Sequence, residues 1–534
     1  MTARLRRTLV VVATALVTSA HVGSPDTYFE GAAGPYPIRV IVRNPGVIPG
    51  QAEITVRLLG PQRARRVLVL PVYWDPRTAA PPPPDVAQPV PGDSTLYGAA
   101  LWLMRSGSYG VQVTVEGAAG TGTTLVPVQA VATRRLELEN PLGIALVGLG
   151  GLLFAGALTI VRAAVRESVL PPGEVPDRKQ TVSAGVAMAV CSIVLGVGLA
   201  GGRAWWNRVD AAYRSGLYQP VHAAATVRGG ARERVLRLAI DDTSWTTRTR
   251  QSTLLVPDHG HLMHVFLVRD AGLDAFAHLH PLPLDSVTFE AKLPPVPPGR
   301  YRIYADVVHE SGFAQTLVAT ADVSTPATAW RPSDADDAFL TTGNEKRETG
   351  DANGETGNGK QETGNVTSRL ADGSTMIWER GDAPIIVDRE APLRFVIRAP
   401  DGAPATLEPY MGMAGHAMIT RDDGAVFAHL HPAGTISMAA QETFLLRQPG
   451  DTVRGALGKR LTEMETTGGG ASGAGARADV PRPTSHAPAS STATVSFPYA
   501  FPQPGHYRLW IQVKRQGRIL TGAFDANLDA SVRL

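Results

Sequence analysis

Two long runs of apolar residues without any charged side chain divide this chain of 534 residues. The first covers residues 141–161 and the second covers residues 181–202. Each run is close to the length of about 20 residues that an α-helix needs to cross the hydrocarbon core of a bilayer. Inside a bilayer the backbone must satisfy its own hydrogen bonds, and a helix does so within one segment. The sequence therefore predicts two transmembrane helices joined by a cytoplasmic loop over residues 162–180.

The first 20 residues indicate on which side of the membrane the rest of the chain lies. Three arginines precede a short apolar stretch that ends at Ala20. This pattern is typical of a cleaved signal peptide, and a retained membrane anchor is the alternative. A signal peptide places the residues after it outside the cytoplasm, and the residues after the second helix lie outside again. We therefore expect a bacterial inner-membrane protein with its other domains in the periplasm.

The exported parts of the chain have the patterns of β-strands. "PIRVIVRNPG" and "QAEITVRLLG" alternate apolar and polar residues and end at glycine, as half-buried strands do. The 55 glycines and 42 prolines favour many short strands and turns. We expect a mainly β protein with three β domains, the first a sandwich of immunoglobulin-like type. Their predicted ranges are residues 21–140, 218–327 and 371–534.

Two stretches of biased composition interrupt the β domains. Residues 328–370 contain "TTGNEKRETGDANGETGNGKQETGN", which has no apolar residue to bury. We expect a disordered linker there. Residues 448–490 form a second such stretch, which we predict to be an insert of low complexity within the third β domain.

Composition also limits the function. The formal net charge is only +3, so nothing indicates a nucleic-acid partner. The single cysteine, Cys191, excludes an intrachain disulfide framework and a zinc site built from several cysteines. We find no glycine-flanked nucleophilic serine, no phosphate-binding glycine loop and no pair of carboxylates that stands out. The sequence therefore predicts no enzymatic activity.

The hexapeptide "FAHLHP" occurs twice, at residues 276–281 and at residues 427–432. Further along the chain, "PPGRYRIY" at residues 297–304 matches "QPGHYRLW" at residues 503–510. The two motifs lie 55 residues further apart in the second case, which is close to the size of the insert. The second and third β domains are therefore copies, which we call the first copy and the second copy.

In each copy, histidines gather on one face of a predicted hairpin. Alternate side chains of a strand share a face, so the His-x-His of each hexapeptide points two imidazoles the same way. The strands "HVFLV" and "HAMIT" precede the hexapeptides across short polar turns. Folding about those turns places a third histidine opposite the last histidine of the hexapeptide. The predicted groups are His264, His278 and His280 in the first copy and His416, His429 and His431 in the second.

The residues just before these strands point to copper. "HGHLMH" aligns with "MGMAGH", so His259 and His261 correspond to Met411 and Met413. Thioether suits Cu(I), and imidazole suits Cu(I), Cu(II) or Zn(II). A zinc site would have little use for methionine. The exchange therefore predicts copper rather than zinc, with these four residues as further ligands.

A structural role for the histidines is the alternative. Histidines at the rim of a hairpin could donate to backbone carbonyls or stack on the phenylalanines of the hexapeptides. Methionines at a domain edge often fill a core. The protein would then be a non-catalytic envelope scaffold or a protein-interaction module.

The stretch "HLMHVFLVRDAGLDAFAHLHP", followed by "PPGRYRIYADV", resembles the small exported β-sandwich domains of the YtkA-like group. It is more loosely similar to periplasmic copper-binding proteins of the CopC type. The resemblance covers the two copies and implies immunoglobulin-like or cupredoxin-like sandwiches that face the periplasm and bind copper. A periplasmic metal donor or acceptor protein would then be the partner. The second copy departs from the pattern where Met-x-Met replaces His-x-His.

Overall fold

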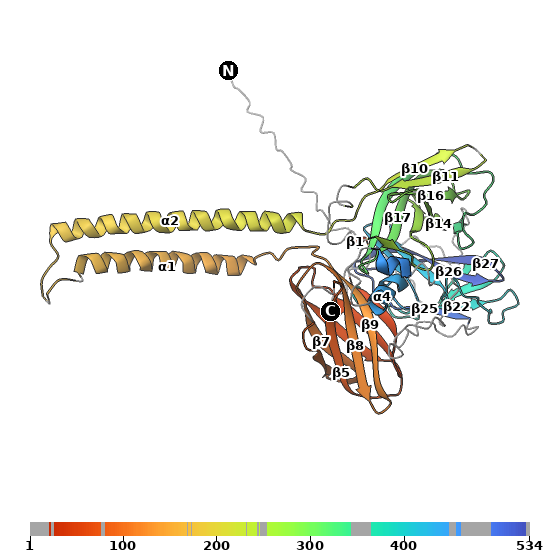
Figure 1. Ribbon diagram of the computed structural model, residues 1–534, viewed down its shortest axis with the longest axis horizontal. Helices are drawn as coiled ribbons and strands as arrows, with labels where there is room; N and C mark the ends of the chain where they lie inside the picture. The colour runs from red at the N-terminus through yellow and green to blue at the C-terminus, as the bar shows by residue number, and fades with distance from the viewer. Residues whose placement is uncertain are drawn as a thin grey trace, which may run out of the picture. The chain divides into compact units, whose positions relative to one another are not determined.

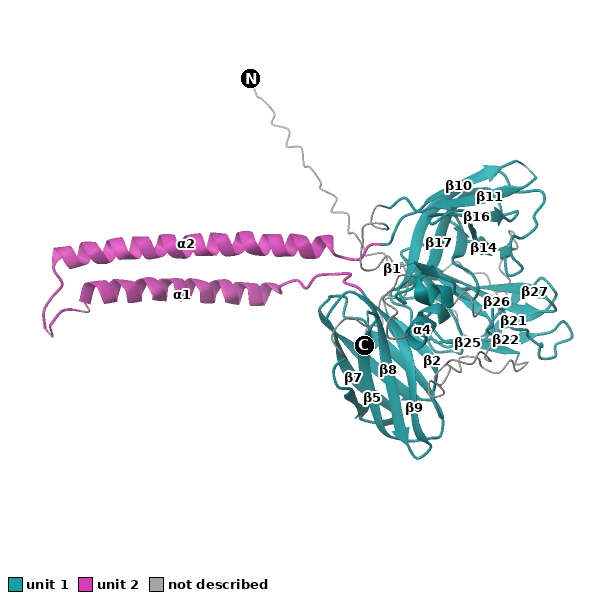
Figure 2. Ribbon diagram, in the orientation of Figure 1, with its two compact units in different colours: residues 1–130, 220–534 teal, residues 131–219 magenta. Residues whose placement is uncertain are grey.

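The computed structural model is mainly β, with several antiparallel sheets and two long apolar helices, as the sequence predicts (Figure 1). It forms two compact units, Met1–Ala130 with Pro220–Leu534 and Val131–Gln219 (Figure 2). The predicted signal peptide, residues 1–20, lies outside the described residues. The structure describes residues 21–22, 26–75, 81–167, 169–171, 173–230, 232–242, 245, 254–342, 365–447, 455–460 and 493–529.

The smaller unit consists of two helices, α1 (Asn140–Glu167) and α2 (Arg178–Ser215), which run side by side in opposite directions (Figure 2). Both are long and apolar enough to cross a membrane. Ala184 is the only residue of either helix that is buried, so their apolar side chains face outward as membrane helices require. Both helices extend beyond the predicted spans: α1 continues into the loop to Glu167, and α2 continues past residue 202 to Ser215. Asp177 caps α2 by accepting a hydrogen bond from the N–H of Gln180.

The N-terminal β domain is built on one antiparallel sheet in the order β2-β3-β4-β7-β6-β5-β8-β9. Its strands alternate buried and exposed residues, most regularly in β3 and β4. β2 also lies against β9, so the sheet curls until its two ends meet. The strands are β2 (Thr27–Ala33), β3 (Tyr36–Arg43), β4 (Gly50–Leu58), β5 (Ala64–Tyr73), β6 (Asp85–Val90), β7 (Asp93–Leu103), β8 (Gly107–Gly117) and β9 (Gly120–Ala130).

The first copy consists of two sheets around a core that includes Leu236, Phe289 and Ile303. The outer sheet has the order β10-β11-β16-β15, and the inner sheet has the order β12-β17-β13-β14-β19, with β18 also paired to β17. The outer strands are β10 (Ala224–Gly229), β11 (Arg234–Ala239), β16 (Thr288–Leu293) and β15 (Leu282–Pro283). The inner strands are β12 (Leu255–Val256), β17 (Gly299–His309), β13 (His264–Arg269), β14 (Ala275–Leu279), β19 (Ala338–Thr341) and β18 (Ala314–Val323).

The second copy repeats this plan. Its inner sheet has the order β1-β24-β23-β26-β27, and its outer sheet has the order β20-β21-β22-β25. The hairpins β13–β14 and β17–β18 of the first copy recur as β23–β24 and β26–β27, with the same pairing of β13 to β17 and of β23 to β26. The inner elements are β1 (His21–Val22), β24 (Val426–Leu430), β23 (His416–Arg421), β26 (Gly505–Arg515) and β27 (Arg518–Leu528). The remaining elements are β20 (Val366–Arg369), β21 (Thr375–Trp378), β22 (Leu393–Arg398), β25 (Thr494–Phe497) and the helix α4 (Met438–Leu445).

The predicted linker, residues 328–370, is ordered at both of its ends. β19 adds to the edge of β14, and β20 opens the outer sheet of the second copy. Composition does not reveal such strands, because they are stabilised by backbone hydrogen bonds to an edge that is distant in sequence. Within the predicted insert, Gly455, Leu457 and Gly458 donate backbone hydrogen bonds to the buried carboxylate of Glu310. The rest of both stretches lies outside the described residues.

The two inner sheets pack against each other through an aromatic layer. Phe276 of the first copy stacks on Trp510 of the second, with ring centroids 5.0 Å apart. Tyr304 of the first copy stacks on Phe427 of the second at 4.2 Å. Phe276 and Phe427 occupy equivalent positions in the two copies, and so do Tyr304 and Trp510. In each stacked pair one copy supplies the first of these positions and the other copy the second, so the arrangement is reciprocal. Each inner sheet is therefore buried on both faces, and all residues of β13 except the last are buried.

Candidate metal centre

Both histidine hairpins form with the predicted register. Phe266 pairs with His278 across β13 and β14, and Met418 pairs with His429 across β23 and β24. One step of two residues further along each ladder, the predicted histidine pairs meet. The ring centroids of His264 and His280 are 5.0 Å apart, and those of the equivalent pair in the second copy are 5.1 Å apart. These side chains share a face with the aromatic layer and therefore point into the interface between the copies.

The histidines predicted for the two sites lie in one continuous group that spans both copies. Because the inner sheets pack face to face, imidazoles from both copies become neighbours. The centroids of His264 and His429 are 5.7 Å apart, and those of His259 and His431 are 5.3 Å apart. We call the whole set the histidine cluster. Its members are His259, His261, His264, His278, His280, His416, His429 and His431.

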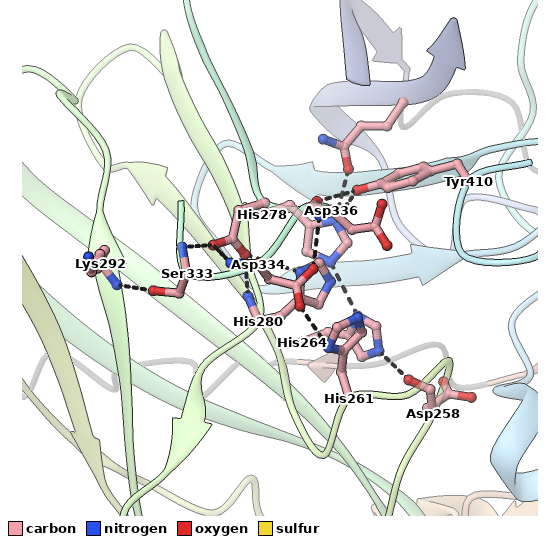
Figure 3. A network of polar contacts seen from close by, with 12 residues as sticks. Asp258, His261, His264, His278, His280, Lys292, Ser333, Asp334, Asp336 and Tyr410 are labelled. Atoms are coloured by element: carbon pink, nitrogen blue, oxygen red, sulfur yellow. Dashed lines mark hydrogen bonds and ion pairs between the residues drawn. The ribbon is translucent and has the colours of Figure 1, made fainter. Parts of the chain in front are cut away.

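Three sets of side chains in this cluster could hold a metal ion. In each set the ligand atoms lie within 4.8 Å of one another. Figure 3 shows the part formed by the first copy, where His261, His264, His278 and His280 lie close together. The sets are His264, His278 and His280; His259, His416 and His431; and His261, His280 and Asp334.

Equivalent turns carry the histidines and methionines that precede the two hairpins. Asp258 and His261 exchange two backbone hydrogen bonds, and so do Tyr410 and Met413. The second residue of each turn has a positive φ, 55° at His259 and 48° at Met411, and the glycine that follows it also has a positive φ. Both turns thus have the dihedral pattern of type I′. The predicted alignment of the two stretches is therefore confirmed at the level of the backbone.

The two turns contribute differently to the cluster. His259 lies beside His416 and His431 of the other copy, with centroid distances of 5.7 and 5.3 Å. The ring of His261 lies 4.0 Å from that of His280 in its own copy. Met413 is buried and Met411 half-buried at the equivalent positions.

Three histidines of the cluster are held at Nδ1 and have an unpaired Nε2. His280 Nδ1 lies 3.1 Å from Asp337 Oδ1, and His429 Nδ1 lies 3.2 Å from Asp306 Oδ2. His431 Nδ1 donates to the backbone carbonyl of Ile436 at 2.7 Å. An imidazole anchored in this way is oriented as metal-binding histidines are, with the other nitrogen left to bind. Among the described residues, Nε2 of these three histidines is buried and has no hydrogen-bond partner.

Two further histidines have unpaired nitrogens. Both ring nitrogens of His416 are buried without a partner in the described structure, and so is Nε2 of His259. His264 and His278 instead contact each other, with Nδ1 of His264 3.3 Å from Nε2 of His278. His278 Nδ1 in turn lies 2.9 Å from Oε1 of Gln512 in the second copy.

Burial favours the neutral form of several histidines of the cluster. Burial lowers the pKa of His264, His278, His416 and His431 well below the usual value, and repulsion from the neighbouring histidines lowers it further. Burial also lowers the pKa of His259. A metal ion binds neutral imidazole, so these rings need lose no proton near pH 7.

Several polar residues of the site were not predicted from the sequence. Asp306 and Gln512 occupy equivalent positions, two residues after the stacked Tyr304 and Trp510. The alternation of a strand indicates that each shares the face of its aromatic neighbour, and this signal was available. Others come from a turn and from the predicted linker, where no period identifies them. They are Asp258, Tyr410, Asp334 and Asp337.

The described structure thus defines a mainly β protein with two helices that suit a membrane and a buried histidine cluster that could hold a metal ion. A family described as a domain of unknown function (DUF8832) matches residues 228–325 and 368–453, which lie in the two copies. No curated protein matches the chain.

Two solved structures are similar to this chain at low sequence identity. An engineered protein is 20% identical over 16% of this chain, with a TM-score of 0.13, and this chain covers 17% of its length. A putative membrane anchored protein from Corynebacterium diphtheriae is 8% identical over 94% of this chain and 93% of its own length, also with a TM-score of 0.13.

Proposed function

We propose that this chain is a membrane-anchored copper-binding protein of the bacterial periplasm, which stores, delivers or senses copper through the histidine cluster. One observation carries the proposal. Five buried imidazoles have unpaired nitrogens in one place, and three of them are held at Nδ1. A buried polar atom without a partner costs about 1–3 kcal/mol, so a concentration of such atoms in a core favours a bound ligand that satisfies them.

Copper accounts for the ligand types better than zinc does. The cluster offers imidazole, which binds both metals, and carries no thiolate. Methionines stand at the two positions of the second turn that histidines occupy in the first. Thioether is a ligand for Cu(I), so this exchange supports copper. The resemblance of the two copies to YtkA-like domains and to CopC-type proteins supports the same metal.

The membrane helices and the amino-terminal residues support the proposed location. α1 and α2 are apolar enough to anchor the chain. The pattern of the first 20 residues supports export of the β domains. A soluble metal donor or acceptor in the same compartment would be the partner of a copper-handling protein.

Copper binding by the full chain in detergent tests this proposal. We expect tight, stoichiometric binding of Cu(I) or Cu(II) that a His280→Gln/His431→Gln variant loses. His506→Gln is the matched control, because His506 lies on β26 outside the cluster and pairs with Asp525. Binding that the double variant retains would overturn the proposal.

A structural role has one observation in its favour. The ring of His278 stacks on Phe266 at 4.4 Å, next to the aromatic layer that joins the copies. In a scaffold protein the cluster would merely extend this layer. The full chain would then bind no copper, and the double variant would only be less stable.

A further inference from the structure

We infer that the histidine cluster holds two metal ions in one coupled centre rather than a single ion between the copies. This inference rests on the proposed function and deepens it. We call the set His264, His278 and His280 the first position, and the set His259, His416 and His431 the second position.

The number of ligands exceeds what one ion can use. A tetrahedral metal site takes four ligands, and a site with an open position takes three from the protein. The two positions share no residue, and each supplies three imidazoles whose ligand atoms lie within 4.8 Å of one another. Ring centroids of different positions lie further apart, 6.2 Å for His259 and His264 and 6.3 Å for His278 and His416. Each position thus offers three imidazoles to one ion, and in the first position metal bonds would replace the contact between His264 Nδ1 and His278 Nε2.

His429 lies between the two positions. Its ring centroid is 5.7 Å from that of His264, 5.6 Å from that of His416 and 4.5 Å from that of His431. Its Nδ1 is held by Asp306, and its Nε2 is buried without a partner among the described residues. His429 can therefore complete either position as a fourth ligand.

Carboxylates lie beside ligands of both positions. Four carboxylates approach nitrogens of cluster histidines, and within the described residues none of the four forms an ion pair with lysine or arginine. Asp337 contacts a ligand of the first position, and Asp258 lies beside a ligand of the second, so each position has a buried carboxylate near it. The contacts are Asp258 with His259 at 3.8 Å, Asp334 with His261 at 3.8 Å, Asp337 with His280 at 3.1 Å and Asp306 with His429 at 3.2 Å.

The second position also crosses between the copies. His259 comes from the first copy, whereas His416 and His431 come from the second. An ion there binds both copies directly. Loading of the second position therefore depends on the packing of the two inner sheets.

The test is the copper content and the Cu(II) electron paramagnetic resonance of the full chain in detergent, loaded with copper and oxidised with ferricyanide. His264→Gln removes a ligand of the first position alone, and His416→Gln removes one of the second alone. His506→Gln is again the control. We expect two copper ions per chain in the parent and the control, with a spectrum broadened by coupling between the two spins. Each single variant should hold one ion with a sharp, isolated signal, and the His264→Gln/His416→Gln variant should hold none.

The outcomes separate this inference from the proposed function. One copper ion per chain in the parent, lost in either single variant, would overturn the two-ion centre and leave copper binding in place. No copper in the parent would overturn both. Two ions with isolated signals that neither variant changes would place the copper elsewhere and overturn both. The count and the spectrum of the parent decide between one ion and two even if a variant fails to fold.

Discussion

The segment that orients His431 is clamped to the N-terminal β domain, and this contact predicts a sharp effect of one substitution. Glu30 N–H donates to the carbonyl of Ala433 at 2.8 Å, and Thr435 N–H donates to the carbonyl of Tyr28 at 3.0 Å. Tyr28 N–H also donates to the side-chain oxygen of Thr435. The N-terminal domain thus acts as a support for the second position.

Gly434 allows this close contact. Its φ is +116°, and a Cβ added there would lie 1.9 Å from the carbonyl oxygen of Tyr28. In a Gly434→Ala variant the segment must therefore move away from β2. Losing the three hydrogen bonds costs about 0.5–1.5 kcal/mol each, and the strained φ costs about 1–3 kcal/mol. Because part of this loss is recovered by relaxation and by water, we expect the free energy of unfolding to fall by about 2–4 kcal/mol.

The same change should weaken copper binding. The carbonyl of Ile436, which holds His431 Nδ1, belongs to the displaced segment. Disturbing a residue that orients a metal ligand typically lowers affinity about 10–100-fold, and we expect a loss of this size at the second position. Urea unfolding measures the stability, and competition with a copper chelator measures the affinity of each position.

Gly517→Ala is the control for the backbone strain. Gly517 has a φ of +69° in the turn between β26 and β27, and a Cβ there would meet no atom within 4 Å. The Gly517→Ala variant should therefore lose stability without losing affinity for copper. If Gly434→Ala unfolds more easily but binds copper as tightly as the parent, the clamp does not position His431. Unchanged stability would refute the steric argument itself.

Other consequences follow from the interface, the burial of ionisable groups and the metal. Tyr304→Ala removes the ring stacked on Phe427 and should cost about 3–5 kcal/mol in urea unfolding, with a loss of the coupled copper spectrum; an unchanged spectrum would show that the copies do not need this stack. The lowered pKa values of the cluster histidines mean that the unfolded chain binds more protons, so metal-free protein should lose stability as the pH falls below about 6.5, less steeply in His416→Gln. Burial raises the pKa of Asp26 to about 6, so the folded state is stabilised by protonated Asp26 below about pH 4 and loses this stabilisation as the pH rises to 6. The loss amounts to about 2–3 kcal/mol in the free energy of unfolding, and Asp26→Asn should abolish it. Removing copper with a chelator should lower the thermal unfolding temperature of the parent and leave that of the His280→Gln/His431→Gln variant unchanged.

The histidine hairpins could be predicted because their causes are local. A short polar turn and the alternation of side chains set which residues face each other, and Phe266 and Met418 pair as those rules require. The two membrane helices were predictable for a similar reason, since length and lack of charge suffice. The packing of the two copies against each other is less clearly indicated by the sequence. "HVFLV" and "AFAHL" are apolar without alternation, which indicates strands buried on both faces, but the covering surface is not specified.

The differences between the copies explain why the sequence of neither copy alone predicts the whole site. At four equivalent positions the first copy has a histidine or an aspartate where the second copy has a methionine, a tyrosine or a glutamine. The second copy therefore has no histidine or aspartate of its own at these positions beside its three cluster histidines. His259 and the carboxylate of Asp306 from the first copy lie there instead. The set His264, His278 and His280 lies within the first copy, whereas the set His259, His416 and His431 is completed only by the packing of the two inner sheets. The four pairs are Asp258 and Tyr410, His259 and Met411, His261 and Met413, and Asp306 and Gln512.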